Sequence, residues 1–431
     1  MKEVYDVIVV GAGAAGVGAA VGAAQAGAKT LLVECGPCLG GAATQKNVLT
    51  YCGFYTQPLP SKQAVGGVAE QVLTELQALH AVEGPVRLPA PSSHVIAILD
   101  TEGVKLALDR VVTRAKVQVL LHTMVVGGSR NGDSITAVTL QDDRGPREVS
   151  ASAFVDASGE GDLAAFGGAS VRYGNQGIAE VGTMSVRIGG IAPNADRSGG
   201  RWAQAVKATK AAGASSLDKE DGLVLSLPIS GDLITYYVDA TYNALDGASI
   251  TAAEITGREK ACAYLKAAQT IPGYEKAYIV STGPKFGTRE SRHVNAQYQI
   301  TEADITGGTR HSDVVALGAW PMEYHPGGGE PTVWKDIKDK GTFDIPLRTL
   351  MSVDTRNLFS AGRLADGDSG GGGAIRVMGT SFATGHAAGV SAAHYARTGG
   401  LSVREIQAVL REQGALIDGD NLPDPLMLVA L

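Results

Sequence analysis

The hydrophobic pattern at the start of the chain predicts a strand, a helix and a second strand. Residues 4–10 (VYDVIVV) are β-branched and almost continuously apolar, which is typical of a buried parallel strand. Residues 12–26 are rich in Ala and other small residues and predict a helix, and residues 30–34 (TLLVE) predict another short strand. This order forms a βαβ unit and therefore predicts an α/β fold with a parallel sheet.

The pattern continues with alternating helices and strands up to about residue 160. Helical spacing of apolar residues, short β-branched runs and a hairpin turn at Asn131-Gly132 predict the elements that follow. These are helices at 67–80 and 103–114, and strands at 117–121, 134–140 and 153–156.

The middle of the chain has a different pattern. Alternating runs at 183–188 and 233–238 predict an antiparallel sheet, and residues 251–269 predict a helix. A strand at 357–362 and a helix of small residues at 380–396 then return to the first pattern. We therefore predict a Rossmann-like domain built from both chain ends, with an inserted α+β substrate or cap domain. The predicted boundaries are residues 1–169 and 325–431 for the first, and 170–324 for the second.

Composition and charge exclude several classes of protein. A chain of 431 residues is longer than one core usually organises, and 44% hydrophobic with 19% charged residues is typical of a globular protein. The net charge of −7 and the lack of a basic block argue against nucleic acid or membrane partners. Neither a transmembrane run nor a signal peptide is evident, so a cytoplasmic location is the default expectation.

The four cysteines are too few for a disulfide framework or an iron–sulfur cluster. Cys35 and Cys38 are spaced like a redox pair, but they follow a predicted strand rather than open a helix, where a thiol pKa would be depressed. We therefore favour a role in the loop over a redox switch. No metal site is predicted, and any electrons must leave through an organic cofactor.

A glycine motif lies between the first predicted strand and helix. Gly11 permits the tight turn, Gly13 lets a pyrophosphate approach the backbone, and Gly16 allows helix and strand to pack closely. With Ala14 and Ala15, these residues form the N-terminus of the helix, where free amides and the helix dipole favour an anion. The sequence thus predicts a dinucleotide-binding site.

Glu34 closes the second strand about 20 residues after the glycine motif. Its carboxylate can accept hydrogen bonds from ribose hydroxyls, and its charge would repel a 2′-phosphate. The motif and Glu34 together do not separate FAD from NAD.

Three later segments resemble the FAD-dependent oxidoreductase family that is related to fumarate reductase flavoproteins and, more distantly, to the glutathione reductase-type FAD fold. They are residues 156–162 (DASGEGD), 357–363 (NLFSAGR) and 379–389 (GTSFATGHAAG). In the family a Thr stands where this chain has Ser158. The resemblance implies FAD as the cofactor of the Rossmann-like domain, a Gly-rich loop after Arg363, and a last helix whose N-terminus points at the flavin pyrimidine.

The resemblance also implies where FAD lies, with the flavin ring between residues 40–44 and 372–389. A surface of small residues on the last helix allows a flat ring to approach, although tight packing would need the same residues. Besides the glycine motif and Glu34, the predicted cofactor-binding residues are Gly40, Gly41, Ala42, Thr44, Ala157, Ser158, Gly159, Gly362, Arg363, Gly372 and Gly385.

Two motifs of disulfide reductases are missing from the sequence. The paired Cys motif of disulfide reductases does not follow Gly40-Gly41, and no second G-x-G-x-x-G motif indicates a separate NAD(P)H domain. Thioredoxin-type disulfide exchange is therefore disfavoured.

His325 is the candidate proton acceptor, since an unperturbed imidazole titrates near pH 6.5 and acts as a base at neutral pH. It lies in a His-Pro-Gly-Gly-Gly turn. The related family has a His at this place, flanked by Asp residues where this chain has Tyr324 and Pro326. A structural hydrogen bond is the alternative for His325, and His293 is the next candidate for the base.

Arg376 and Arg289 are the candidates for a bidentate clamp on a substrate carboxylate. A structural ion pair is the alternative for each, and Glu290 or Asp313 are possible partners of Arg289.

These features predict an FAD-dependent dehydrogenase or oxidase that transfers a hydride between a small organic substrate and flavin N5. One alternative is a flavin-dependent reductase of an activated C=C bond, as in the fumarate reductase relatives. Another is a non-catalytic flavin-binding subunit of a larger complex. The sequence leaves open the substrate, the electron acceptor and assembly into a homo-oligomer.

Overall fold

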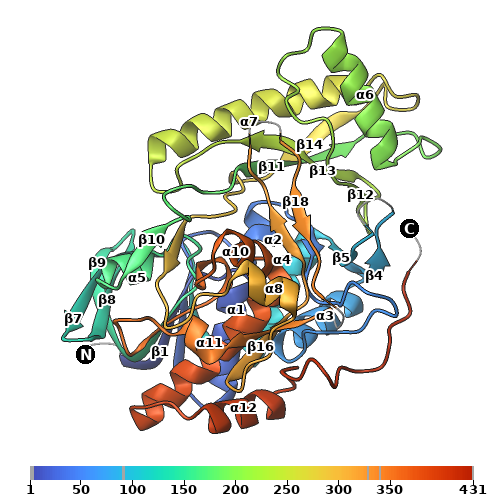
Figure 1. Ribbon diagram of the computed structural model, residues 1–431. Helices are drawn as coiled ribbons and strands as arrows, with labels where there is room; N and C mark the ends of the chain where they lie inside the picture. Colours follow the sequence, from blue (N-terminus) through green and yellow to red (C-terminus); the bar gives the residue numbers. More distant parts are fainter. Residues whose placement is uncertain (1–3, 90–92, 328–329, 339–340, 430–431) are drawn as a thin grey trace.

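The main sheet of the protein joins the two ends of the chain. The computed structural model describes residues 4–89, 93–327, 330–338 and 341–429. Seven of the described strands form the sheet in the order β6-β2-β1-β9-β8-β7, and β20 pairs with the end of β9 (Figure 1). They are β1 (Val4–Val10), β2 (Thr30–Val33), β6 (Gln118–Leu120), β7 (Met124–Asn131), β8 (Ser134–Asp142), β9 (Gly145–Asp156) and β20 (Leu358–Ser360).

The pairing confirms the predicted parallel sheet. Strands β6, β2, β1, β9 and β20 are parallel, whereas β7 and β8 extend the sheet as an antiparallel hairpin. Because β20 comes from the last fifth of the chain, the Rossmann-like fold is built from both ends, as predicted.

Two helices of small residues pack against each other beside this sheet. They are α1 (Ala14–Gln25) and α11 (Met378–Thr398). A Cβ on Gly385 would lie 2.0 Å from the carbonyl oxygen of Ala15, and one on Gly389 would lie 2.0 Å from that of Ala19. These glycines of α11 therefore face the backbone of α1, and the small residues serve helix–helix packing.

A smaller sheet and several helices cover the rest of the Rossmann-like part. The sequence did not predict the sheet, whose strands are β3 (Thr50–Tyr51), β5 (Val95–Leu99) and β4 (Val82–Arg87). The predicted helices are present as α3 (Val68–Ala78) and α4 (Thr101–Arg114), and Asp100 caps α4 through two backbone amides.

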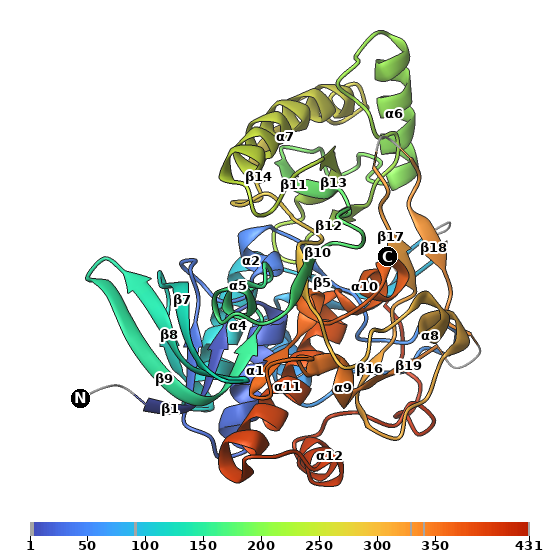
Figure 2. The ribbon, with the colours of Figure 1, turned by 60° about the vertical axis from the view of Figure 1, so that its left-hand side comes forward.

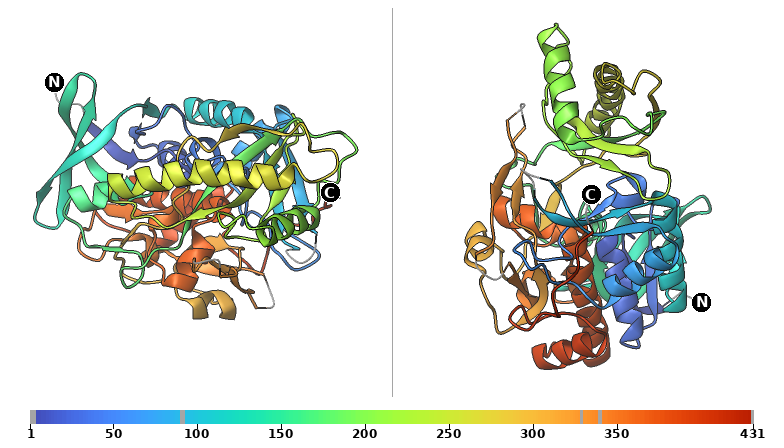
Figure 3. Two further views of the ribbon diagram at one scale, coloured as in Figure 1. Left: turned by 90° about the horizontal axis from the view of Figure 1, so that it is seen from above. Right: turned by 90° about the vertical axis from the view of Figure 1, so that its right-hand side faces the viewer.

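A separate antiparallel sheet stands above the main body (Figures 1 and 2). Its order is β12-β13-β11-β14, and α6 and α7 cover it. The bounds are β11 (Gly182–Gly189), α6 (Gly199–Ala211), β12 (Val224–Ser226), β13 (Leu233–Ala240), α7 (Gly247–Ala268) and β14 (Tyr278–Thr282). A second hydrophobic core, with members between Met184 and Phe286, belongs to this part. Seen from the side in Figure 3, it projects from the rest of the molecule. The domain boundaries at 169 and 324 stay a prediction.

The remaining described elements are mostly short. They are α2 (Ala42–Gln45), α5 (Asp162–Phe166), β10 (Val171–Tyr173), β15 (Arg292–Val294), α8 (Glu302–Gly307), β16 (Val314–Gly318), β17 (Met322–Tyr324), β18 (Val333–Lys335), β19 (Phe343–Pro346), α9 (Leu347–Leu350), a 3₁₀ turn (Gly362–Leu364), α10 (Ser369–Ile375) and α12 (Val403–Glu412). Among the described residues, no helix is long and apolar enough to cross a membrane.

The run of four glycines at 370–373 is helical, which corrects the expectation of a Gly-rich loop. Asp368 caps α10 by accepting from the Gly371 amide. A Cβ on Gly371 would lie 2.3 Å from the carbonyl oxygen of Ile300, and one on Gly373 would lie 2.4 Å from that of Glu323. Close packing on both sides therefore explains a helix of glycines, despite their poor helix propensity.

Candidate functional site

The carboxyl ends of the parallel strands bring the predicted cofactor segments together. The Gly11 amide donates to Val33, and the Ala157 amide donates to Val10, at 2.7 and 2.8 Å. The Ala361 amide donates to Asp156 at 3.1 Å. The glycine motif and the loops after β9 and β20 thus meet at one edge, where ligands of open α/β sheets bind.

The three motif glycines have different surroundings. Gly11 has a φ of +91°, and a Cβ there would lie 2.3 Å from the Ala157 carbonyl oxygen. A Cβ on Gly16 would lie 1.6 Å from the Gly11 carbonyl oxygen. Both glycines are therefore required by the fold itself. For Gly13 the nearest atom is the Cα of Gly41 at 3.8 Å, so the fold alone tolerates a side chain there.

The loops around the N-terminus of α1 approach it closely. A Cβ on Gly41 would lie 2.8 Å from the Cα of Gly13, and one on Gly362 would lie 2.9 Å from the Cβ of Ala15. Gly13, the N-cap of α1, has no side chain to cap the helix. The first-turn amides are thus left for an anion, as a dinucleotide diphosphate would supply.

Several predicted cofactor residues shape their own loops. Thr44 donates its hydroxyl to the Leu39 carbonyl at 2.7 Å, and Ser158 donates to Asp156 Oδ1 at 2.7 Å. Gly40 donates its amide to the Ala12 carbonyl at 2.8 Å. Ala42 begins α2, and Gly159 has a φ of +84° beside Arg363. Contacts of these residues with FAD stay a prediction.

Glu34 is buried and firmly held. Its Oε2 accepts from the Ala12 amide at 2.7 Å, while Oε1 accepts from the Gly36 amide at 2.7 Å and from Gln45 Nε2 at 3.1 Å. Cys35 Sγ is a fourth, weaker donor to Oε1 at 3.4 Å, but Oε2 accepts only one bond and can still accept from a ribose hydroxyl. The side chain therefore fits the predicted role and also orders its own loop.

Glu34→Ala is expected to weaken FAD binding by about 1–3 kcal/mol, the scale of losing charge-assisted hydrogen bonds. A titration of the apoprotein with FAD, followed by flavin fluorescence, measures this change. Glu34→Gln keeps one oxygen acceptor and should have a smaller effect. An unchanged affinity in the alanine variant would remove Glu34 from the cofactor site.

The cysteines of this region are free thiols. Burial and the charge of Glu34 raise the pKa of Cys35. A raised pKa disfavours the thiolate, which is the reactive form. This agrees with a loop role for Cys35 and Cys38.

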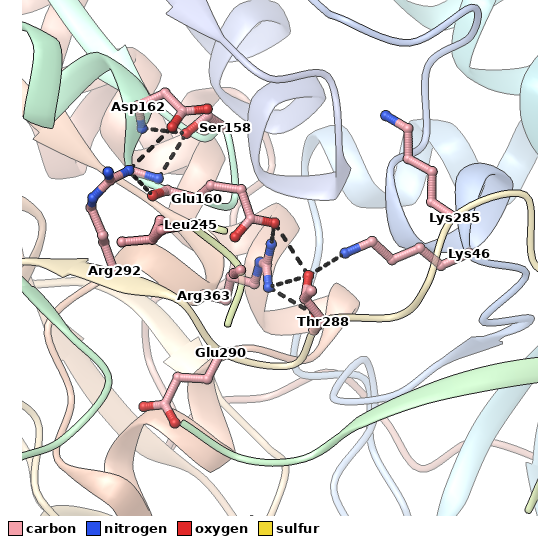
Figure 4. Close-up of polar contacts among 12 residues, drawn as sticks. Lys46, Ser158, Glu160, Asp162, Leu245, Lys285, Thr288, Glu290, Arg292 and Arg363 are labelled. Carbon is pink, nitrogen blue, oxygen red and sulfur yellow. Dashed lines mark hydrogen bonds and ion pairs between the residues drawn. The ribbon is translucent and has the colours of Figure 1, made fainter. Parts of the chain in front are cut away.

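A polar cluster lies between the Rossmann-like part and the upper sheet (Figure 4). Arg363 forms an ion pair with Glu160 and donates to the Thr288 carbonyl at 2.8 Å. Thr288 Oγ1 lies 3.2 Å from Glu160 Oε1, and Lys46 Nζ donates to Thr288 Oγ1 at 2.7 Å. Arg363 is a predicted cofactor residue and Glu160 lies within the 156–162 motif, whereas Lys46 and Thr288 belong to no recognisable motif.

A second polar cluster brings together the three predicted catalytic residues. Arg376 Nε pairs with Glu180 Oε1 at 3.0 Å, and the His325 amide donates to Glu180 Oε2 at 2.9 Å. Arg289 Nη1 donates to the Val181 carbonyl at 2.6 Å. The three residues therefore converge on Glu180 and on Val181 beside it, and neither of these two was predicted from the sequence.

The partner of Arg289 differs from the sequence-based expectation. Its closest carboxylate is that of Asp239, at 3.7 Å, rather than Glu290 or Asp313. Asp313 instead pairs with Arg348 at 2.8 Å.

His325 is the middle of a hydrogen-bonded chain. Its Nε2 lies 3.1 Å from Glu323 Oε1, and Thr332 Oγ1 lies 3.0 Å from its Nδ1. Burial acts to raise the pKa of Glu323, but the hydrogen bond and charge of His325 and the charge of Arg376 hold it well below its usual range. Glu323 is therefore an ionised carboxylate.

The expectation that His325 titrates near its ordinary value is wrong. Burial, and then the charge of Arg289, lower the pKa of His325 to about 4. The imidazole is thus neutral at neutral pH. Because Glu323 is ionised, Nε2 carries the hydrogen and Nδ1 accepts from Thr332.

His293 has both ring nitrogens occupied. Its Nε2 lies 2.8 Å from Glu290 Oε1, and its Nδ1 lies 3.1 Å from the Ala365 carbonyl oxygen. The Cε1 atom of His293 would lie 3.5 Å from a Cβ on Gly372. Since both nitrogens face acceptors, His293 has no lone pair directed at a substrate.

The second cluster adjoins the N-terminus of α11. Arg376 stands between α10 and α11, and Cys52 accepts from the Gly379 amide at 2.8 Å. Thr380, in the first turn of α11, is fully buried, and its Oγ1 has no hydrogen-bond partner among the described residues. This hydroxyl is enclosed by protein beside Gly53, where a Cβ would lie 2.8 Å from it, so it does not face a ligand site. In the described part of the chain, no group of His, Cys, Asp or Glu forms a metal site.

The chain matches one known protein family. The family model described as FAD dependent oxidoreductase matches residues 6–414. No curated protein matches the chain.

Solved structures with a similar arrangement are remote in sequence. A geranylgeranyl bacteriochlorophyll reductase-like protein from Thermoplasma acidophilum has 13% identity and a TM-score of 0.49, over 95% of this chain and 84% of that chain. A flavoprotein/dehydrogenase from Cytophaga hutchinsonii has 13% identity and a TM-score of 0.47, over 95% and 83%. An anhydrotetracycline hydroxylase from Streptomyces rimosus has 15% identity and a TM-score of 0.44, over 97% and 70%.

Proposed function

Because the chain belongs to the FAD dependent oxidoreductase family, we propose that it is a dehydrogenase or oxidase that removes a hydride from a small organic substrate. When bound, FAD supplies the hydride acceptor at flavin N5. The residues of the chain hold the substrate and take up the proton that is released with the hydride. A C–H bond next to an O–H or N–H group meets this requirement.

The observation that carries this proposal is the chain of hydrogen bonds from Glu323 through His325 to Thr332 beside α11. The outer end of this chain is the Thr332 hydroxyl. We propose that a substrate proton passes to Thr332 Oγ1 while the Thr332 hydroxyl proton moves to His325 Nδ1. The carboxylate of Glu323 stabilises the imidazolium that forms, as a carboxylate does in hydrolase triads.

Arg289 is the better candidate for holding a substrate carboxylate. The guanidinium of Arg376 is already bound to Glu180 through two nitrogens, at 3.0 and 3.2 Å. Arg289 donates to a neutral carbonyl, and its nearest carboxylate, in Asp239, lies at 3.7 Å. Arg376 then acts by orienting Glu180, which in turn holds the His325 backbone.

The state of His325 favours oxidation over reduction of a C=C bond. A reductase needs a proton donor in this position, and an imidazole whose pKa is about 4 is deprotonated at neutral pH. The buried ionised groups also argue against a non-catalytic flavin-binding subunit. Enclosing charges costs folding free energy, and a protein without a reaction to perform would have no use for them.

An anaerobic bleaching screen tests the proposal. The purified yellow protein is mixed with alcohols, amines and hydroxy acids, and the flavin absorbance is recorded. If one of these compound classes causes a loss of absorbance near the flavin maximum, it is the substrate class. Failure of every class, together with reoxidation of dithionite-reduced protein by activated alkenes, would replace this proposal with the reductase alternative.

A further inference from the structure

We infer that Lys46 and Lys285 bind the diphosphate of the cofactor opposite the N-terminus of α1, so that two amines and the helix amides hold it between them. This inference rests on FAD as the cofactor of the family and is independent of the proposed direction of hydride transfer.

The two lysines begin on adjacent backbone segments. Lys46 directly follows α2, and the Lys285 amide donates to the Gln45 carbonyl at 2.8 Å. The start of α2 touches α1, because a Cβ on Gly41 would lie 2.8 Å from the Cα of Gly13. Figure 4 shows both side chains extending from this junction.

The two amines lie beside different segments of the predicted cofactor site. Lys285 Nζ is 3.8 Å from the sulfur of Cys35, the residue after Glu34. Lys46 Nζ points instead at Thr288, which Arg363 also contacts. Lys285 therefore lies at the ribose end of the predicted site, and Lys46 lies toward the loop after β20.

Neither amine forms a direct ion pair with a described carboxylate, and Glu160 acts on Lys46 only through its charge. Arg363 is neutralised by Glu160, and Arg292 is paired with Asp162 at 3.2 Å. Among the described residues, Lys46 donates to a hydroxyl and Lys285 to a thiol, and neither forms an ion pair with a carboxylate. Lys285 is exposed, whereas Lys46 is largely enclosed, and an enclosed amine without a directly bound carboxylate is costly unless an anion joins it. A diphosphate, with two negative charges, meets that need.

The charge of Lys46 makes cofactor binding depend on pH. Burial first, and then the charge of Arg363, lower the pKa of Lys46 to about 7; Lys285 also lowers it, while Glu160 and Cys35 raise it. A bound diphosphate favours the charged amine and raises the pKa. FAD affinity is therefore greatest below pH 7 and falls above it, by up to about tenfold per pH unit until the pKa of the complex is reached.

The experiment compares Lys46→Met with the wild type and with Lys207→Met, a change to an exposed lysine of α6. Apoprotein is titrated with FAD, ADP and adenosine between pH 6 and pH 9, and its thermal unfolding is recorded. We expect Lys46→Met to weaken FAD and ADP roughly tenfold or more at pH 6 and to abolish the pH dependence. Adenosine, which has no phosphate, should bind all variants equally.

A merely structural role for Lys46 would give a different result. If Lys46 only braced Thr288, its loss would lower the melting temperature of the apoprotein and weaken adenosine as much as ADP. Removing a buried amine that has only a hydroxyl as its partner should instead leave the apoprotein as stable or more stable. Unchanged ADP affinity in Lys46→Met and in Lys285→Met, with a folded apoprotein, would overturn the inference while leaving FAD as the cofactor.

Discussion

Gly13→Val is expected to give a folded protein that no longer binds FAD. A Cβ at Gly13 meets only the Cα of Gly41, at 3.8 Å, and the backbone of Gly13 is extended with a φ of −69°, which any residue adopts. The fold therefore accepts a side chain at this position. The diphosphate does not, because a valine side chain would occupy the place where it meets the amides of α1.

Circular dichroism and an FAD titration of the apoprotein measure the two parts of this prediction. Affinity should fall by roughly a hundredfold or more, about 2.7 kcal/mol, while the spectrum and melting temperature stay close to those of the wild type. Gly16→Val is the matched control: a Cβ there would lie 1.6 Å from the Gly11 carbonyl oxygen, so that variant should fail to fold. Normal FAD affinity in folded Gly13→Val would contradict the placement of the diphosphate.

The glycine motif illustrates what the sequence could predict. The order of a β-branched run, the spacing of Gly11, Gly13 and Gly16, and Glu34 at the end of the next strand are local features with one physical explanation. That β20 belongs to the Rossmann-like part was also predictable, because a strand that runs into Gly362 repeats the pattern of the first strand, but its pairing with β9 was not. Local sequence therefore specified the carboxyl edge at which the cofactor segments meet.

The polar clusters could not be predicted in this way. Glu180 comes after a stretch without clear periodicity, yet it binds Arg376 and the backbone of His325. Lys46 reaches Thr288, which is 242 residues away in the chain. Such contacts depend on how the upper sheet lies over the Rossmann-like part, and no single segment carries that information.

The glycine clusters could not be assigned from the sequence to ligand binding or to backbone packing. From the sequence, the glycines of α11 suit either a flavin ring or close packing, and those of 370–373 suit a loop. Gly385 faces Ala15 of α1, and Gly371 faces Ile300, so both sites pack backbone against backbone. A glycine indicates that something approaches closely, but only the fold tells whether that is a ligand or another helix.

His325→Ala is expected to slow flavin reduction by roughly 10²–10⁴, the usual contribution of a positioned base. The loss follows from removing the acceptor for the Thr332 hydroxyl proton. FAD should stay bound, because His325 contacts Glu323, Thr332 and Glu180 rather than the α1 site. Stopped-flow absorbance with the substrate class found in the bleaching screen measures the rate.

The pH profile separates a base from a structural histidine. Since the pKa of His325 is about 4, the rate should stay level through pH 6.5, where an ordinary imidazole titrates, and fall only as the pH approaches 4. Glu323→Gln removes the negative charge that stabilises the imidazolium, so it should slow reduction. The effect should be smaller than that of His325→Ala, because the base itself is still present. Thr332→Ser keeps the hydroxyl and should retain most of the rate, whereas Thr332→Val should lose it. Near-normal reduction in both His325→Ala and Thr332→Val would show that the proton leaves by another route.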